Sequence, residues 1–292
     1  LTVLDKDGNV IDTWKSVKGE EHLIERLTAG ETYTLREEMA PYGYLMAEEI
    51  TFTVEDTAEI QKVEMKDAVP TGTLIINKKG EFLDKVSTLD SVGGWLKHLF
   101  EYFSGSLKEV TFEVYALEDI KAADGESEDY YKKDALVATV TTDADGYATV
   151  KNLPLGRYYV KEKNAPDTYV LNTVPENVEF AYADQDTAVI EKEISVTDER
   201  QKVSITIEKQ DAETGNTVAG AVFGIYNAKD IQTKDGKVIV KADTLLQEMT
   251  SDEKGQAACT LDLPLGSYYV KELKAPDGFV SSDEVLRFDA SY

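Results

Sequence analysis

One short motif occurs three times in this chain and restricts what the chain can fold into. Each copy has a tyrosine, a glutamate four residues later and a proline four residues after the glutamate. The glutamates are Glu37, Glu162 and Glu272. The residues around them alternate in hydrophobicity as in a β-strand, where successive side chains point to opposite faces. Each glutamate therefore shares the apolar face of its strand with a tyrosine and an aliphatic residue.

A carboxylate on a core-facing position needs an explanation. An isolated ionised carboxylate there would cost several kcal/mol or would take up a proton. Each glutamate must therefore have a partner nearby or be kept neutral for chemistry.

Length and composition point to a chain of several β-domains. The 292 residues fit two or three domains of about 100 residues, and the three motif copies favour three. We expect a first unit at 1–69, a second unit at 70–200 and a third unit at 201–292. With 16 tyrosines and many Val, Ile and Thr residues, the predicted fold class is all-β, with tandem antiparallel β-sandwiches.

The three units repeat one another in part. The second unit contains LPLGRYYVKE and the third LPLGSYYVKE, which indicates a tandem duplication. The first unit opens with TVLDKDGNVIDTW, a hairpin pattern about a DG turn. The runs HLIERL, ITFTVED and IQKVEMKD are expected to be further strands of the first unit.

Residues 81–107 of the second unit have no counterpart in the third. Leu96, Leu99 and Phe103 recur at helical spacing, which predicts a short helical insertion. The insertion is expected either to be a lid over its own sandwich or to bind a partner, because recognition is often carried by insertions on a stable scaffold. The candidate ligand-binding residues are Trp95, Phe100 and Phe103.

The charge balance excludes two classes of partner. With 56 acidic and 31 basic residues, the formal charge of −25 is opposite to the basic surface that nucleic acids and anionic membranes require. We expect this charge to give solubility, with attraction of cations or of a basic partner as the alternative.

No cofactor or metal site is expected. The single cysteine, Cys259, rules out an intrachain disulfide, and the two histidines lie in different units and cannot form a zinc cluster. No apolar run approaches the roughly 18 residues that span a bilayer, so no membrane insertion is expected in this segment. Export or anchoring signals are expected outside these residues.

The first strands of the second and third units each carry an inward lysine. Lys78 alternates with Leu74 and Ile76, and Lys209 alternates with Ile205 and Ile207.

The last strands of the first and second units carry an inward acid in the same way. These acids are Asp67 and Asp198, and each precedes the next lysine by eleven residues.

In the second unit three ionisable groups are therefore expected to face one core. If Lys78, Glu162 and Asp198 were all ionised, one carboxylate would lack a counter-charge, so desolvation favours a proton on one acid and a neutral amine. Lys78 could then attack the Asp198 carboxyl and lose water, forming an isopeptide bond with Glu162 as acid and base. A buried ionic network without a covalent link is the alternative.

The sequences VSITIEKQDAETG, GAVFGIY, LPLGSYYVKELKAPDGF and ISVTDERQ resemble the collagen-adhesin B-type repeats, which are SpaA-like and prealbumin-like domains of Gram-positive surface adhesins and pilin shafts. The resemblance implies that a first-strand lysine is joined to a last-strand Asn or Asp, assisted by the repeated glutamate. It assigns the donor to Lys78 and Lys209 and the acceptor to Asp67 and Asp198. The assisting residues are then Glu37, Glu162 and Glu272.

Only the second unit carries all three residues. The first unit lacks the lysine strand and the third lacks the acceptor strand. We expect a fragment of a longer repeat protein, whose partners are neighbouring repeats of the same protein. The alternative is that the third unit of one molecule supplies a strand to the first unit of another, head to tail.

Three functions are compatible with these features. The first is a structural stalk or shaft repeat of a cell-surface adhesin or pilin, exposed outside the cell and stabilised by the Lys–Asp bond. The second is an adhesin that binds a host matrix protein or glycan through the insertion. The third is an enzyme, which is disfavoured because the sequence shows no nucleophile triad, metal cluster or phosphate loop, and self-crosslinking would turn over once.

Overall fold

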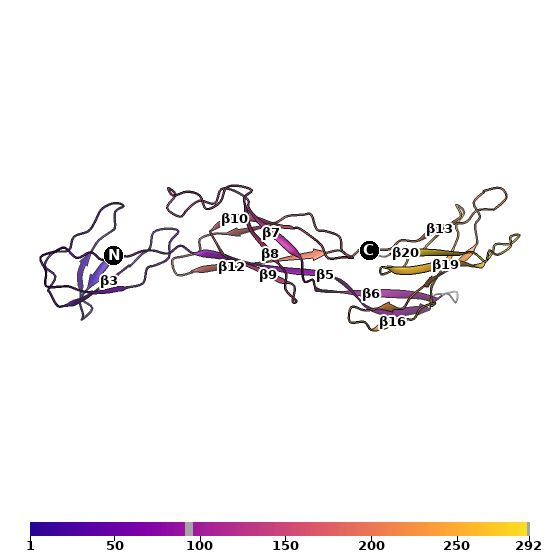
Figure 1. Ribbon diagram of the computed structural model, residues 1–292, viewed down its shortest axis with the longest axis horizontal. Coiled ribbons are helices and arrows are strands. Elements are labelled where there is room, and N and C mark those ends of the chain that lie inside the picture. Colours follow the sequence, from indigo (N-terminus) through magenta and orange to yellow (C-terminus); the bar gives the residue numbers. More distant parts are fainter. Residues whose placement is uncertain (91–95, 291–292) are drawn as a thin grey trace.

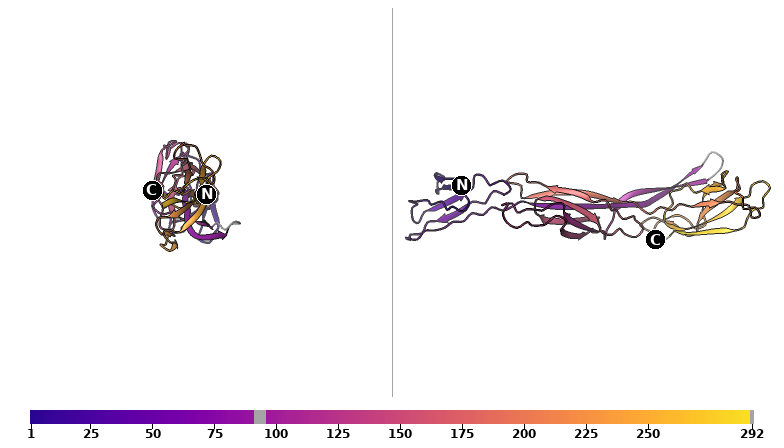
Figure 2. Two further views of the ribbon diagram at one scale, coloured as in Figure 1. Left: turned by 90° about the vertical axis from the view of Figure 1, so that its right-hand side faces the viewer. Right: turned by 90° about the horizontal axis from the view of Figure 1, so that it is seen from above.

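The three units follow one another along a single long axis. The structure, a computed structural model, describes residues 1–90 and 96–290. The first unit lies at one end of an elongated molecule and the third at the other (Figure 1), and the view from above gives the same order (Figure 2). The described residues form β-strands and no α-helix, so none of them belongs to a helix that could cross a membrane. The all-β prediction is confirmed.

The first unit contains a single four-stranded sheet in the order β2-β1-β3-β4. The expected opening hairpin forms between β1 and β2. The prediction of strands at 22–27 and 60–67 is wrong, because these residues form no β-strand in the structure. Val63 and Met65 nevertheless pack against the core of the sheet. The strands are β1 (Thr2–Leu4), β2 (Val10–Thr13), β3 (Thr32–Arg36) and β4 (Ile50–Thr53).

The second unit encloses its core between two sheets. One has the order β11-β10-β7-β8, and in the other β12 and β9 flank β5. The expectation of wholly antiparallel pairing is wrong at one place, because β12 runs parallel to β5. Its strands are β5 (Thr71–Asp90), β6 (Leu96–Ser106), β7 (Thr111–Ala116), β8 (Leu136–Thr141), β9 (Tyr147–Leu153), β10 (Gly156–Glu162), β11 (Glu176–Phe180) and β12 (Val189–Asp198).

The third unit repeats part of this arrangement. Its larger sheet has the order β17-β14-β19-β20, and β13 pairs with β18 opposite it. Its strands are β13 (Thr206–Glu208), β14 (Val222–Asn227), β15 (Ile231–Gln232), β16 (Val238–Val240), β17 (Leu245–Thr250), β18 (Gln256–Ala258), β19 (Gly266–Lys274) and β20 (Val285–Ala290).

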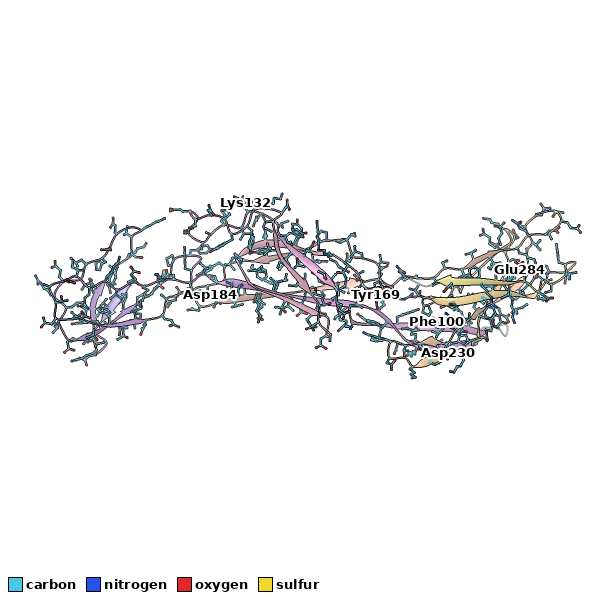
Figure 3. All side chains as sticks on the ribbon, viewed as in Figure 1. Phe100, Lys132, Tyr169, Asp184, Asp230 and Glu284 are labelled. Atoms are coloured by element: carbon cyan, nitrogen blue, oxygen red, sulfur yellow. The ribbon has the colours of Figure 1, made fainter. Side chains whose placement is uncertain are left out.

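The inserted segment is a β-hairpin, so the prediction of a helix is wrong. β5 continues past the second unit and pairs antiparallel with β6, with Val86 opposite Phe100. The hairpin extends to the third unit, where Phe100 is 4 % exposed and packs in the same core as Ile205 and Ile207 (Figure 3). It is therefore not a lid over its own sandwich.

The packing of β6 explains why helical spacing was misleading. His98 and Phe100 are buried on the face toward the third unit, whereas Leu99 and Phe103 on the other face are 41 % and 46 % exposed. Burial therefore has the period of two that a strand gives. The buried side chains of β6 are stabilised by contacts with the core of the third unit. The sequence of the insertion by itself does not indicate these contacts. Trp95 lies outside the described residues.

A buried arginine joins the hairpin to both units. Arg200 follows β12, is 7 % exposed, and lies over the ring of Tyr102 on β6, 3.8 Å from its centroid. The guanidinium also forms ion pairs with Glu81 on β5 and with Asp262 in the third unit. Tyr102 donates a hydrogen bond of 2.8 Å to the carbonyl of Asp262. The second and third units are thus connected by the hairpin as well as by the linking chain.

We predict that Phe100→Ala destabilises the third unit. Truncating a buried phenylalanine costs about 3–5 kcal/mol, and here the lost contacts lie in the third-unit core. Hydrogen exchange of β14 and β19 amides should accelerate, with little change in β7 and β10. The matched control is Phe103→Ala on the exposed face, and equal effects of the two substitutions would contradict this role of the hairpin.

Candidate functional site

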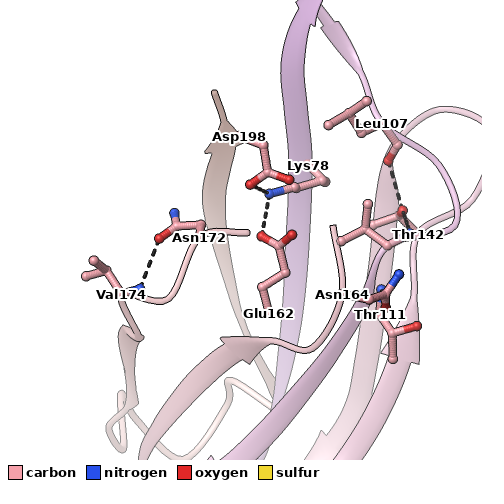
Figure 4. Close-up of polar contacts among 10 residues, drawn as sticks. Lys78, Leu107, Thr111, Thr142, Glu162, Asn164, Asn172, Val174 and Asp198 are labelled. Carbon is pink, nitrogen blue, oxygen red and sulfur yellow. Dashed lines mark hydrogen bonds and ion pairs between the residues drawn. The ribbon is translucent and has the colours of Figure 1, made fainter. Parts of the chain in front are cut away.

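Three strands bring one ionisable side chain each to the same point in the second-unit core. Lys78 comes from β5, Asp198 from the end of the neighbouring strand β12, and Glu162 from the end of β10 in the opposite sheet. The parallel register places Val196 opposite Lys78, so Asp198 lies one inward position further along. Figure 4 shows the lysine between the two carboxyl groups.

The three groups are in contact and sealed from solvent. The Nζ of Lys78 lies 2.6 Å from Oε2 of Glu162 and also contacts Oδ1 of Asp198. All three side chains have an exposed fraction of 0 %. The ring of Phe112 covers the amine, with its centroid 5.8 Å from Nζ. Because water is excluded, the polar contacts of these groups must come from one another and from the surrounding protein.

The environment raises the pKa of Glu162, so its carboxyl group stays protonated to a higher pH than that of a free glutamate. Burial raises the pKa of Glu162 to about 7, the nearby Lys78 opposes this shift, and the carboxyl of Asp198 adds to it. A carboxyl group that titrates near neutral pH can both donate and accept a proton under ordinary conditions.

The ionic arrangement leaves part of each acid unsatisfied. Among the described residues, neither Oε1 of Glu162 nor Oδ2 of Asp198 has a hydrogen-bond partner. A buried oxygen without a partner costs about 1–3 kcal/mol. As an ionic network, the site therefore carries an energetic cost from these two oxygens.

Two glycines that no sequence pattern connects with the site shape it. A Cβ on Gly80 would approach Leu107 and Tyr169 to 2.6 Å, so only glycine lets these two side chains close the core beside Asp198. Gly146 has a φ of +81°, and a Cβ there would lie 2.7 Å from the carbonyl of Lys78. The dipeptide Asp145-Gly146 is typical of a hairpin turn, but the contact of Gly146 with the lysine depends on the tertiary fold.

The third unit contains two of the three groups. The Nζ of Lys209 lies 3.1 Å from Oε1 of Glu272. The lysine backbone is held as in the second unit: its N–H donates to the carbonyl of Gly255 at 2.8 Å, as that of Lys78 donates to Gly146. Within the described part of this unit no acid occupies the place of Asp198, and the Lys209 side chain is 17 % exposed.

The first unit contains the glutamate and the aspartate, which are Glu37 and Asp67. Glu37 is 7 % exposed and accepts a hydrogen bond of 2.7 Å from the backbone of Ala47. Burial and the proximity of Glu37 raise the pKa of Asp67. The ion pairs of the described first unit all involve other acids, so this pair has no lysine.

The candidate ligand-binding residues do not form a site. Phe100 is buried in the third-unit core, and Phe103 packs against Phe82 with ring centroids 5.7 Å apart. The structure therefore separates these two aromatic residues onto opposite faces of β6.

We predict an unusual pH dependence for Lys78→Ala. In this variant Glu162 loses the cation that lowers its pKa, so its folded-state pKa rises above about 7 while the unfolded value stays near 4.5. A raised carboxyl pKa favours the folded state when the group is protonated, so stability is lost as pH rises from about 4.5 through the folded-state pKa.

The loss should approach about 1.4 kcal/mol per pH unit inside that window. Urea unfolding of the variant between about pH 5 and pH 8 measures it. The control is Lys78→Ala combined with Glu162→Gln, in which this slope should be reduced. An unchanged slope would show that Glu162 is not the titrating group.

Comparison with known proteins bears on the fold of the chain. The family model described as SpaA, prealbumin-like fold domain, matches residues 1–69, 103–196 and 203–291. No curated protein sequence matches the chain.

Several solved structures are similar. The TIE protein of Bacillus anthracis is 25% identical, with a TM-score of 0.53; the match covers 89% of this chain and 39% of that one. This chain thus spans well under half the length of the TIE protein. A mutant of the shaft pilin SpaA from Lactobacillus rhamnosus GG is 20% identical, with a TM-score of 0.29 and coverage of 76% and 95%. A streptococcal ancillary pilin is 21% identical, with a TM-score of 0.31 and coverage of 89% and 71%.

The family model covers most of the chain and falls on all three units. The resemblance noted in the sequence is thereby confirmed, and the chain belongs to the SpaA family of prealbumin-like fold domains.

Proposed function

We propose that this chain is a structural stalk or shaft segment of a bacterial surface adhesin or pilin, and that an isopeptide bond between Lys78 and Asp198 stabilises it. The observation that carries this proposal is the sealed contact of one amine with two carboxyl groups, which leaves two carboxyl oxygens unsatisfied. Membership of the SpaA family of prealbumin-like fold domains supports the same interpretation at the level of the fold.

The chemistry needs only groups already in contact. A proton passes from the Lys78 ammonium to a carboxylate, which leaves a neutral amine beside a protonated Asp198. The Nζ of Lys78 then attacks Cγ of Asp198, forming a C–N bond. A C–O bond breaks and the oxygen leaves as water. Glu162 takes the proton from the attacking nitrogen and gives one to the departing oxygen.

Exclusion of water favours this reaction in the folded chain. Burial costs an ionised amine or carboxylate more hydration energy than it costs the neutral forms that react. The fold also holds the reacting atoms in contact, which replaces a bimolecular encounter with an intramolecular one. The reaction occurs once per chain and has no external substrate, so the protein is not an enzyme in the ordinary sense.

The bond would protect most of the second unit from force. Lys78 and Asp198 are 120 residues apart in the sequence but lie on adjacent parallel strands. Tension entering at the start of β5 would pass through the bond to the residues after β12. The enclosed residues, including the hairpin, would carry none of it. By analogy with disulfides, a crosslink of this span contributes roughly 4–5 kcal/mol through the entropy of the unfolded chain.

The rest of the molecule suits a load-bearing role. The units lie in a row (Figure 1), and both junctions are held by direct contacts. At the first junction Gln185 accepts a hydrogen bond of 2.9 Å from the backbone of Met46, and Tyr182 donates one of 3.0 Å to the carbonyl of Tyr44. The hairpin and Arg200 hold the second junction. We infer an extracellular location on the surface of a Gram-positive bacterium, with neighbouring repeats as the partners.

The adhesin alternative finds less support. It required the aromatic residues of the insertion to face a ligand, whereas Phe100 is buried against the third unit. The described hairpin instead has a structural partner within the chain, which accounts for its aromatic content.

We predict that the denatured chain has a mass one water below the value calculated from its sequence. Lys78→Ala and Glu162→Ala should each restore the full mass, because one removes the nucleophile and the other the proton carrier. Intact-mass spectrometry measures this directly. Lys79→Ala, on the opposite face of the same strand, is the matched control and should keep the deficit. A full mass in the unaltered chain would reduce the trio to a buried ionic network.

We also predict a difference under mechanical load. When single molecules are pulled from both ends, unfolding of the second unit in Lys78→Ala should release on the order of 400 Å of additional chain, given about 3.5 Å per extended residue. The unaltered chain should lack this extension, and Lys79→Ala should behave like it. Release of the same length from all three proteins would contradict the proposed path of force.

A further inference from the structure

Two pairs of tyrosines lie stacked on the outer faces of the sheets that carry Glu162 and Glu272. One pair is Tyr115 on β7 opposite Tyr159 on β10, and the other is Tyr226 on β14 opposite Tyr269 on β19. The ring centroids are 5.1 Å apart in the first pair and 5.0 Å apart in the second, with interplanar angles of 11° and 3°. All four side chains are partly exposed. The same geometry therefore recurs at equivalent positions of two units.

Each pair has a carboxylate within hydrogen-bond reach of a phenol. The hydroxyl of Tyr159 donates to Oδ1 of Asp134 at 3.2 Å, and that of Tyr269 donates to Oδ1 of Asp243 at 3.1 Å. Both aspartates have a left-handed backbone, with φ of +62° and +60°, which is uncommon outside glycine. The N–H of each aspartate donates a hydrogen bond of 2.8 Å to the carbonyl of the residue after the other tyrosine of the pair. The fold thus holds a proton acceptor at the same place in both pairs.

A lysine ammonium lies close to each pair. The Nζ of Lys161 is 5.2 Å from the ring centroid of Tyr159 and 5.7 Å from that of Tyr115, and the Nζ of Lys271 is 4.6 Å from that of Tyr226. A nearby cation opposes the build-up of positive charge on a ring. An electron therefore leaves the phenol most easily when the hydroxyl proton leaves with it, and the hydrogen-bonded aspartate is placed to accept that proton.

We propose that Tyr115–Tyr159 and Tyr226–Tyr269 are sites of oxidative modification, at which hydrogen peroxide activated by a haem peroxidase joins the two rings of each pair as dityrosine. Stacking holds the reacting rings together before oxidation, which replaces a bimolecular encounter with an intramolecular one. This modification does not depend on the amide bond between Lys78 and Asp198.

The reaction balances with one peroxide for each pair. Each phenol loses one electron to the oxidant and its hydroxyl proton to a carboxylate, which leaves two neutral phenoxyl radicals. A carbon beside the hydroxyl-bearing carbon of one ring forms a C–C bond to the corresponding carbon of the other ring. The hydrogen on each bonded carbon then moves to the phenolic oxygen, and both rings become aromatic again. The two electrons and two protons reduce the peroxide to two water molecules, so the chain loses two hydrogen atoms.

The new bonds would join the central strands of two sheets. In the order β11-β10-β7-β8 and in the order β17-β14-β19-β20, the linked strands are the two inner ones. Each bond would close a loop between residues that are distant in the sequence, and such a crosslink restricts the unfolded chain as a disulfide does. A protein without disulfides would thereby gain a second means of covalent stabilisation from an oxidising environment.

The test exposes the whole chain to hydrogen peroxide and a haem peroxidase. We expect dityrosine fluorescence and a mass lower by two hydrogen atoms for each pair, with crosslinked peptides that contain Tyr115 with Tyr159 and Tyr226 with Tyr269. Tyr159→Phe should abolish coupling at its own pair and leave the other pair reactive, because phenylalanine keeps the stacked ring without the hydroxyl. This mass loss differs from the one water of the amide bond, so the two proposals are tested separately.

The role of the carboxylate is tested in the third unit by Asp243→Asn. Asparagine tolerates a left-handed backbone, but its amide is a far weaker base, so coupling of Tyr269 should slow about tenfold or more. The second-unit pair in the same molecule is the control and should react at its original rate. The third unit is the better place for this variant because Tyr115 has a further carboxylate, Glu113, 2.7 Å from its hydroxyl.

A third pair of tyrosines provides the comparison for proximity alone. The rings of Tyr42 and Tyr182 lie 4.8 Å apart but are tilted by 59°, and the hydroxyl of Tyr182 donates to the carbonyl of Tyr44. We expect this pair to couple more slowly than the two stacked pairs. Coupling at Tyr42–Tyr182 that is equally fast would overturn the proposal. So would crosslinks spread over the other exposed tyrosines, or no loss of hydrogen from the oxidised chain. Circular dichroism of each variant confirms that it is folded.

Discussion

The desolvation of one amine and two carboxyl groups is the constraint on which the second unit depends. Lys78 can be buried there only because Glu162 and Asp198 meet it from two other strands, and those acids can be buried only because the lysine is present. Removing any member leaves a charge or an unpaired polar group in a dry core, which is far more costly than losing a surface pair. The parallel pairing of β5 and β12 follows the same requirement, since it brings the first and last strands of the unit side by side.

The described residues of the three units hold different subsets of the same three groups. The second has the amine, the glutamate and the aspartate, the third has the amine with Glu272, and the first has Glu37 with Asp67. The lysine is fully enclosed in the second unit, where all three groups are present, and partly exposed in the third, where two are present. In the second unit β12 both carries Asp198 and covers the core, so charge neutralisation and exclusion of water are achieved by one element.

The hairpin links the chemistry of the second unit to the stability of the third. β5 carries Lys78 in its first half and forms the hairpin in its second half, where Phe100 on β6 fills part of the third-unit core. Arg200, two residues after Asp198, packs on the same hairpin. A strand that is anchored at one end in a polar core and at the other in an apolar core limits how far the two units can rotate. The stalk or shaft role proposed above would gain from such a connection.

The sequence by itself determined which side chains face inward. Because alternation along a strand has a period of two, Lys78, Glu162 and Asp198 could be assigned to core-facing positions, and the duplication indicated that the third unit would repeat part of the pattern. Only the tertiary structure decided what those faces meet. Helical spacing in the insertion was outweighed by the core of another unit, which no local pattern reveals. The parallel register of β12 and the closure at Gly80 likewise depend on contacts between residues far apart in the chain. Local periodicity determines which face of a strand each side chain points to. Packing across the whole fold determines which residues that face contacts.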